Sequence, residues 1–467
     1  MVLRPMLEAR RLRRTKGGTD PRTLVAVDPA EAARAGRPTL RIAHFSDTYL
    51  PRRDGVVTSL QTLTSAMAEL GHESLLVVPR HPDQPDDDGL LRLPSMPVGV
   101  AQFRLAAWPR SRHVEKVAHW LPHAIHVHTP GPIGLLGIFA ARRLGLPLVQ
   151  TYHTDLRAYA DAYRLPAEVV AAAIRAYARR LGSPTPDMPP LWARRSERRH
   201  AIVDAGTELL LRDSDAVLVP TPAVLTRCKL PVDDDRIYLA PAGVSLPSVP
   251  PGAGAEFRRE HGIAPTDPVA LFVGRVNREK GIDTLVEAFG RVVQKVPNAR
   301  LLLVGAIYEQ RWVNGLLESA GIVDRTVITG QLPPEQVARA YAASDVFAFP
   351  SMTDTQGLVL QEAALADVPF LLADPALYSS GPLSGTGVLA DGGVADYADA
   401  LTRLLTDEPY RRQVAAEAGA RARVNSPASY AERMAAIYGQ AVRRAASATR
   451  LARKSRGPFK GRRRLIA

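Results

Sequence analysis

From Leu40 onward, short apolar runs alternate with longer amphipathic stretches. Runs such as LRIAHFSD, ESLLVVPR and DAVLVPT are typical of buried strands, and TSLQTLTSAMAELGH is typical of a helix that buries one face. The alternation restarts with PVALFVGRV and GIDTLVEAFGRVVQK and continues through DVFAFPS and LVLQEAALAD. Strands that alternate with helices indicate parallel sheets joined by crossover helices. The pattern therefore predicts two α/β domains of similar size.

A Pro- and Gly-rich stretch at 239–257, LAPAGVSLPSVPPGAGAEF, separates the two halves and predicts a linker. We expect a first domain over 39–245 and a second over 246–429. Within the first, Arg- and Ala-rich residues at about 165–212 predict a helical insertion, interrupted by GSPTPDMPP. A last helix at 430–446 is expected to pack back on the first domain.

Charge is concentrated at the two ends of the chain. The 467 residues carry a formal net charge of +13, of which residues 443–467 contribute +10 and residues 1–19 contribute +5. The folded body is thus close to neutral, which argues against a specific nucleic-acid-binding face. We expect a basic, disordered tail at 1–38 and a second basic tail at 447–467. The basic tails suit attraction to an anionic membrane surface; solvated tails and non-specific RNA contact are the alternatives.

Cys228 is the only cysteine, so an intrachain disulfide and a multi-cysteine metal site are excluded. The first residues lack the apolar core of a secretory signal. The most apolar stretch, PIGLLGIFAARRLGLPLVQ, is interrupted by Arg142 and Arg143 and is too short to span a bilayer. We expect a cytoplasmic protein, either free in solution or peripheral on the inner membrane face.

The second half contains a candidate anion site in FVGRVNREKGID. Arg275 and Lys280 flank a Gly-bearing turn that opens a helix, and the free N–H groups of a helix start add to their charge. A pair of solvated surface cations would give the same pattern, so both interpretations remain open at this point.

A second candidate lies in PSMTDTQGLVLQEA. Gly357 is expected at a helix start, where the N–H groups of Leu358 and Val359 would face a ligand phosphate. Glu362 has the geometry to accept hydrogen bonds from a ribose diol, and Asp354 from sugar hydroxyls. An acidic helix start beside one surface glutamate is the alternative.

The first half offers a turn and two histidines. Asp54 and Gly55 occupy the first strand-to-helix turn, and His128 and His153 lie at the carboxyl ends of expected strands. Ligands of doubly wound sheets bind at these ends. A plain turn and structural histidines are the alternatives.

Together these segments resemble the family 4 retaining glycosyltransferases of the GT-B architecture, over roughly residues 40–440. DTQGLVLQEA matches the family's E-x7-E pattern, GRVNREKGID its G-R-x-x-x-E-K-G signature, and RIAHFSDTYLPRRDGVVTSL its N-terminal glycine loop. HVHTPGPIG and YHTDLRAYADAY are similar to motifs of members that glycosylate lipid or polyprenyl-type acceptors. The resemblance implies two Rossmann-like, doubly wound parallel sheets that face each other across a cleft.

The resemblance also implies roles. Arg275 and Lys280 would hold the donor diphosphate without a metal, Glu362 the ribose, and Asp354 the donor sugar, with His153 near the reacting centre. The residues implied to complete the donor site are Gly55, Gly274, Gly330, Leu332, Gly357, Leu358 and Val359. The donor would be a UDP- or GDP-sugar, with no cofactor or metal ion besides.

Three positions depart from the family pattern. The first acid of E-x7-E is Asp354 rather than Glu, Gln356 stands where many members have Phe or Gly, and Asp367 stands where a Gly is usual. The first two occur in a variant of the motif that is associated with glycolipid-type members. These differences bear on the donor sugar more than on the reaction.

The resulting prediction is a retaining hexosyltransferase that uses a nucleotide sugar and a lipid-linked acceptor at the inner membrane face. Three alternatives remain at this level: a soluble small-molecule acceptor, a nucleotide-sugar-binding protein without turnover, and a nucleotide-sugar epimerase of the same architecture. The GRVNREKG segment favours transfer over epimerisation.

Overall fold

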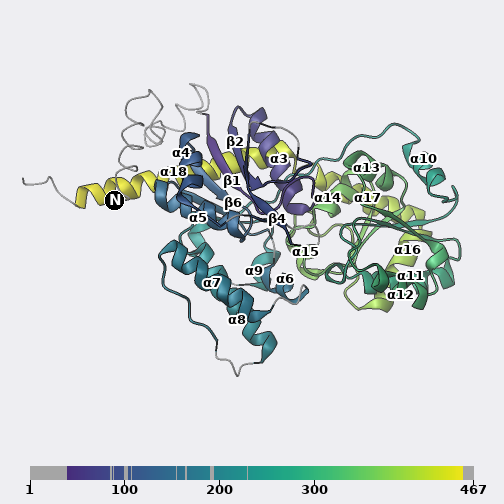
Figure 1. Cartoon of the computed structure of the whole chain (residues 1–467). Coiled ribbons are helices and arrows are strands. Elements are labelled where there is room, and N and C mark those ends of the chain that lie inside the picture. The colour runs from purple at the N-terminus through teal and green to yellow at the C-terminus, as the bar shows by residue number, and fades with distance from the viewer. Residues whose placement is uncertain are drawn as a thin grey trace, which may run out of the picture.

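The structure is a computed structural model that describes residues 39–455, apart from short gaps at 85–86, 88, 99–103, 107, 154, 163–165, 190–193 and 229. The N-terminal tail and most of the C-terminal tail lie outside the described residues. In Figure 1 the two halves lie side by side, each with a sheet enclosed by helices.

In the first half, the described residues contain seven strands that pair in parallel throughout. In their order across the sheet they are β3 (Leu90–Leu93), β2 (Glu73–Pro79), β1 (Arg41–Phe45), β6 (Ala124–Val127), β7 (Leu148–Thr151), β8 (Ala216–Val219) and β9 (Ile237–Leu239). A separate antiparallel pair joins β4 (Ser95–Pro97) to β5 (Arg104–Ala106). The central strands are buried on both faces, as continuous apolar runs require.

The helices of this half are α3 (Gly55–Glu69), α4 (Ser111–His119), α5 (Pro132–Leu144), α6 (Leu156–Ala162), α7 (Ala167–Leu181), α8 (Arg195–Leu211) and α9 (Ala223–Arg227). The helical segment expected at 165–212 corresponds to α7 and α8, which pack against each other below the sheet in Figure 1. The sheet order reverses between β1 and β6, and ligands of doubly wound sheets bind at such a reversal.

The second half repeats this arrangement. Its parallel strands among the described residues are β12 (Thr326–Gly330), β11 (Arg300–Val304), β10 (Val269–Val273), β13 (Val346–Phe349), β14 (Phe370–Leu372) and β15 (Val388–Leu389). The helices are α10 (Ala253–Glu260), α11 (Ile282–Lys295), α12 (Gln310–Ser319), α13 (Pro334–Ala342), α14 (Leu358–Leu365), α15 (Pro375–Ser380), α16 (Val394–Thr406) and α17 (Glu408–Ala422). The strand order is that of the Rossmann fold, so the predicted fold class is confirmed.

Two features of the chain path differ from the sequence prediction. The Pro- and Gly-rich linker is shorter than 239–257, because β9 ends at Leu239 and α10 already begins at Ala253. The last helix, α18 (Pro427–Ser455), is longer than 430–446 and packs on α3 of the first half. Its Tyr430, Met434 and Tyr438 are buried in the core of that half, and Figure 1 shows it crossing there in yellow.

None of the described helices holds an apolar stretch long enough to cross a bilayer.

Candidate active site

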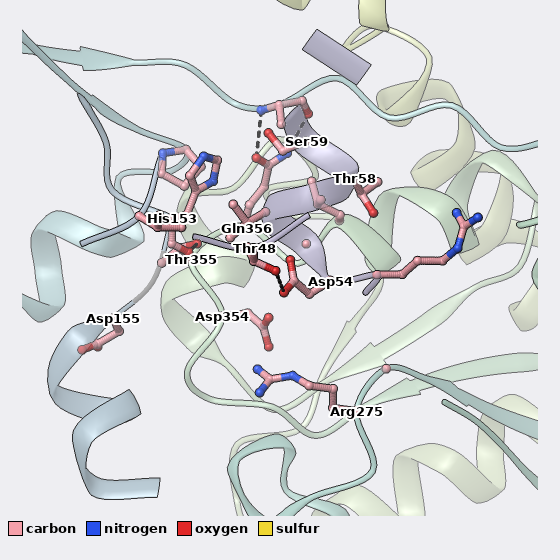
Figure 2. A pocket seen from close by; sticks show the side chains of 18 of the residues that line it. Thr48, Asp54, Thr58, Ser59, His153, Asp155, Arg275, Asp354, Thr355 and Gln356 are labelled. Carbon is pink, nitrogen blue, oxygen red and sulfur yellow. Dashed lines mark hydrogen bonds between the residues drawn. The ribbon is translucent and has the colours of Figure 1, made fainter. Parts of the chain in front are cut away.

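A cavity of about 830 Å³ lies between the two halves, and its lining comes from the carboxyl ends of both sheets. A cavity of this size is typical of small-molecule sites. The predicted site residues that line it are Gly55, His153, Gly274, Arg275, Lys280, Leu332, Asp354, Gly357, Leu358, Val359 and Glu362. Gly330 was predicted to belong to the site but is not among the lining residues. Its carbonyl accepts a hydrogen bond from the N–H of Gly305, and Gly305 does line the cavity. Figure 2 shows part of this lining, with the side chains of Asp354 and Arg275 pointing toward each other.

Lys280 and Asp354 form an ion pair in the cavity wall. The Nζ atom of Lys280 lies 2.8 and 2.9 Å from the two carboxylate oxygens of Asp354. Burial by itself would raise the pKa of Asp354, but Lys280 opposes it, and with Ser351 and Arg275 holds that pKa below its usual value. Asp354 is therefore anionic, and the pair is neutral as a whole.

Arg275 follows β10 and has its own acidic partner. Its Nη2 atom lies 3.2 Å from Oε2 of Glu279, whose side chain is largely buried. Lys280 ends the short 3-10 helix η3 (Arg278–Lys280), which contacts α11. Both predicted cations therefore stand at one edge of the second sheet, each beside a carboxylate. Glu279 was not among the predicted site residues, although it belongs to the matched REKG segment.

Two glycines let the backbone approach closely behind these cations. Gly274 and Gly305 end neighbouring strands with φ of +146° and +149°, a region that residues with a side chain rarely adopt. A Cβ atom on Gly305 would lie 1.8 Å from the carbonyl oxygen of Gly274. Both line the cavity, so main chain rather than side chains forms this part of its wall. Sequence reasoning identified Gly274 and missed Gly305.

The amino terminus of α14 opens into the same cavity. Gly357 precedes the helix with φ of +68°, and Leu358 and Val359 are its first residues, so their N–H groups lack partners within the helix. Glu362 lies one turn further along, where its Oε2 atom accepts a hydrogen bond from the hydroxyl of Tyr341 at 3.1 Å. Burial raises the pKa of Glu362 to about 7.

On the opposite wall, Asp54 caps α3 of the first half. Its Oδ1 atom accepts from the N–H of Val57 at 3.0 Å, and its Oδ2 atom accepts from Thr48 and from Arg52. A Cβ atom on Gly55 would lie 3.8 Å from the side chain of Leu358, so the two halves approach each other here. The glycine loop thus faces the start of α14.

His153 ends a row of buried imidazoles. The Nε2 atom of His153 lies 3.1 Å from Nδ1 of His128, whose Nε2 lies 3.1 Å from Nδ1 of His44; Nε2 of His44 lies 3.4 Å from the hydroxyl of Ser74. Burial lowers the pKa of His44 to about 3 and that of His153 to about 4, so both are neutral. A neutral imidazole has one donor and one acceptor nitrogen, so the tautomers along the row are coupled.

His126 lies beside this row but points elsewhere. With His44 and His128 it forms a buried group whose ring nitrogens come within 4.8 Å of one another, a spacing that could suit a metal ion. However, its Nδ1 and Nε2 atoms each lie 2.7 Å from a hydroxyl, that of Tyr438 on one side and of Thr151 on the other. Hydrogen bonds therefore engage both nitrogens, and the group fits a polar network better than a metal centre.

Hydrogen bonds also connect the two halves around the cavity. The hydroxyl of Thr355 donates to the carbonyl of His153 at 2.8 Å. The side-chain amide of Gln356 donates to the carbonyl of Ala242 and accepts from its N–H, both at 2.8 Å; Figure 2 draws this pair of bonds. Arg227, which sequence reasoning missed, donates to the carbonyl of Asp354 at 2.6 Å. Arg227 carries no motif that would have identified it.

The fold and the cavity define a class. Two Rossmann-like sheets face each other across a cleft, with paired cations and a helix start on one side and a histidine on the other. This is the GT-B architecture, and solved structures agree. Sucrose-phosphate synthase from Thermosynechococcus elongatus superposes with a TM-score of 0.62 at 23% identity, over 86% of this chain and 98% of that one. Anabaena HepE, solved with UDP-glucose, also superposes with a TM-score of 0.62, at 17% identity, over 85% of this chain and 98% of that one.

Family models assign the two halves separately. Residues 53–247 match the model described as Glycosyltransferase Family 4, and residues 254–421 match Glycosyl transferases group 1. The chain therefore belongs to the family 4 glycosyltransferases, and the predicted enzyme class is confirmed.

Curated relatives extend across both halves. Alpha-monoglucosyldiacylglycerol synthase of Streptococcus pneumoniae is 27% identical over 346 residues, which cover 71% of this chain and 70% of the relative. GDP-mannose-dependent alpha-mannosyltransferase of Mycobacterium tuberculosis is 27% identical over 352 residues, which cover 72% and 79%.

Proposed function

We propose that this glycosyltransferase moves a hexose from a nucleoside-diphosphate sugar to a lipid or glycolipid acceptor, with retention at the anomeric carbon and without a metal ion. The observation that carries the proposal is that Arg275, Lys280 and the start of α14, all from the second half, line one cavity together with His153 of the first half. That placement gives a diphosphate two cations and free N–H groups on one side, with room for a sugar toward the other.

In this proposal the donor diphosphate lies between the two cations and the N–H groups of Leu358 and Val359. Such groups are already oriented and stabilise the charge that develops on the leaving phosphate. The bond from the anomeric carbon to the phosphate oxygen breaks, the acceptor oxygen bonds to that carbon from the same face, and the acceptor proton passes to the leaving phosphate. Asp354 contacts the donor sugar and Glu362 the ribose. No enzyme nucleophile is required.

The choice of a lipid acceptor is supported by the relatives. The Streptococcus pneumoniae relative is named for a glucosyl-diacylglycerol product, and so is a relative from Acholeplasma laidlawii that is 26% identical over 343 residues. In this proposal the donor nucleotide is UDP or GDP, and the hexose is glucose or mannose.

Thermal stabilisation by nucleotides tests the donor site. UDP, GDP, ADP and their hexose conjugates are added without metal, since a ligand that binds only the folded state raises the melting temperature. We expect a shift with one nucleotide, lost in Lys280→Ala and kept in Lys295→Ala. Lys295 is an exposed lysine of α11 that pairs with Asp399 and serves as the matched control. No shift with any nucleotide, together with no hexose transfer from the conjugates, would refute the proposal.

We further propose that the protein is peripheral on an anionic membrane, which the basic tails support. Residues 456–467 carry five Lys or Arg and no acid, and each such cation near an anionic surface contributes about 1 kcal/mol. The test is a truncation of the C-terminal tail. Because α18 packs on α3 as part of the first half, the truncation is made after Ser455, where this helix ends. Sedimentation with vesicles containing phosphatidylglycerol should fall on deletion of 456–467. Undiminished sedimentation would overturn this part.

A further inference from the structure

The cavity continues from the donor end into a region between α6, α7 and α8. Apolar side chains line that region and together form what we term the apolar lobe: Val170, Ala173, Ile174, Val203, Leu209 and Leu210. α7 and α8 pack against each other, and α6 contacts both α8 and the segment η3 that carries Lys280. The lobe is therefore part of the same cavity as the donor residues and opens beside them.

The lobe is mostly aliphatic, and one of its polar groups is already engaged within its own helix. The hydroxyl of Thr207, which also lines the cavity, donates to the carbonyl of Val203 one turn back in its own helix, at 2.9 Å. Tyr177 is half-buried, and burial raises its pKa, so its ring stays neutral. A sugar or nucleotide placed here would lose most of its hydrogen bonds to water, because the aliphatic side chains of the lobe offer none in return, and this loss is costly. A hydrocarbon chain loses none.

The position of the lobe fixes the orientation of its occupant. α6 begins at Leu156, three residues after His153, and both residues line the cavity. A molecule with its hydroxyl near His153 and the donor can therefore extend its remaining length directly into the lobe. A hydroxyl at one end and an apolar chain at the other describe an amphiphile.

We infer that the apolar lobe binds one alkyl or acyl chain of the acceptor lipid, so that the first half selects the acceptor by its chain as well as its hydroxyl group. This inference rests on the proposed function and adds the site at which the lipid tail is held. Each methylene group moved from water into the lobe should tighten binding by about fourfold, until the lobe is full.

The test uses butyl, octyl and dodecyl β-glucosides, each below its micelle concentration, with binding followed by calorimetry. Wild-type affinity should rise with chain length. Ala173→Phe fills the lobe from α7 and should remove that dependence, while nucleotide binding stays unchanged. Ala172→Phe is the matched control, because Ala172 is an exposed neighbour on the same helix that does not line the cavity. Val170→Thr keeps the side-chain volume and should weaken the binding of dodecyl glucoside severalfold.

The outcomes separate the two proposals. Chain-length-independent binding by the wild type, with nucleotide binding and hexose transfer intact, would overturn the lobe as a tail site and leave the proposed function standing. The lobe is equally excluded as a tail site if Ala172→Phe and Ala173→Phe behave alike. If nucleotides do not stabilise the wild type and the wild type transfers no hexose, the proposed function itself is refuted.

Discussion

At the scale of single residues, the cations proposed to bind the donor diphosphate are balanced by acidic side chains. Lys280 holds Asp354, and Arg275 lies beside Glu279, so each cation has a carboxylate partner. In the proposed function, an entering diphosphate would exchange one anionic partner of Lys280 for another, which costs less than removing the ammonium group from water alone. Asp354 would then be free to contact the donor sugar, where its shorter side chain would set the reach of the first acid of the motif.

Glu362 gives a pH-dependent prediction. Its pKa of about 7 lies above the usual value for a glutamate, and only the carboxylate can accept hydrogen bonds from both ribose hydroxyls. As pH rises through about 7 the ionised fraction grows, so donor affinity should increase between about pH 6 and pH 8. Glu362→Gln should bind donor about tenfold more weakly or worse, with no such rise. The affinity of wild type and Glu362→Gln for the stabilising nucleotide is measured by calorimetry across this pH range. If the affinities of the two proteins change in parallel with pH, the prediction is contradicted.

Asp367 shows how a departure from a sequence pattern can be structural. It lies after α14 with φ of +55°, a left-handed conformation that glycine adopts without strain and that Asp tolerates better than most residues. Its carboxylate accepts a hydrogen bond from Arg423 at 2.9 Å. The residue thus makes the turn for which the family pattern has Gly, and the difference lies away from the cavity lining.

At the scale of elements, β1 and the carboxyl ends of β6 and β7 place three histidines in one row. The sequence predicted His128 and His153 at strand ends, which is where they lie, but it did not predict that they touch or that His44 continues the row. His44 lies inside β1, in register with His126 of β6. The polar contacts of His44 depend on which strands lie next to β1 in the sheet. Strand order is a property of the tertiary structure, so the sequence did not reveal these contacts.

The buried row predicts how stability responds to acid. The folded protein keeps His44 neutral down to about pH 3, whereas the unfolded chain takes up a proton near the ordinary histidine pKa of about 6.5. The pKa is lowered on folding, so stability is lost as pH falls below about 6.5, by about 1.4 kcal/mol per pH unit for each such histidine. His44→Gln should lower this slope by that amount in chemical denaturation between about pH 5.5 and pH 4, where the unfolded histidine is protonated and the folded one is not.

The comparison needs a second histidine variant. His119 is exposed at the end of α4, so His119→Gln should leave the slope as in the wild type. Equal slopes in the wild type, His44→Gln and His119→Gln would show that the row does not resist protonation.

At the scale of the whole molecule, the segment before α14 links the two halves. Gln356 is buried and bonds both backbone groups of Ala242, in the coil that joins the halves, and Asn425 donates to the same carbonyl at 2.8 Å. Thr355 bonds the main chain of His153. The side chains at 355 and 356 therefore connect the halves, beside the residues proposed to contact the donor sugar.

Removing this link gives a third prediction. Gln356→Ala leaves the buried N–H of Ala242 without its partner, so the free energy of unfolding should fall by about 1–3 kcal/mol. Gln413→Ala is the control, because Gln413 is exposed on α17 and bonds Glu417 within its own helix. Denaturant unfolding of both variants measures the difference; a loss for Gln356→Ala no larger than for the control would contradict the assignment.

The sequence by itself determined the two α/β halves and their parallel sheets, because apolar periodicity is a local property of the chain. It also predicted the residues of the donor end from strand-end motifs, and their roles stay a prediction. It also predicted His153, which follows β7, and Gly55, which begins α3, and both line the cavity. Only the tertiary structure decided that Lys280 pairs with Asp354, that Gln356 bonds Ala242, and that α7 and α8 enclose an apolar lobe. Those contacts join residues far apart in sequence, and no local pattern records which of them will meet.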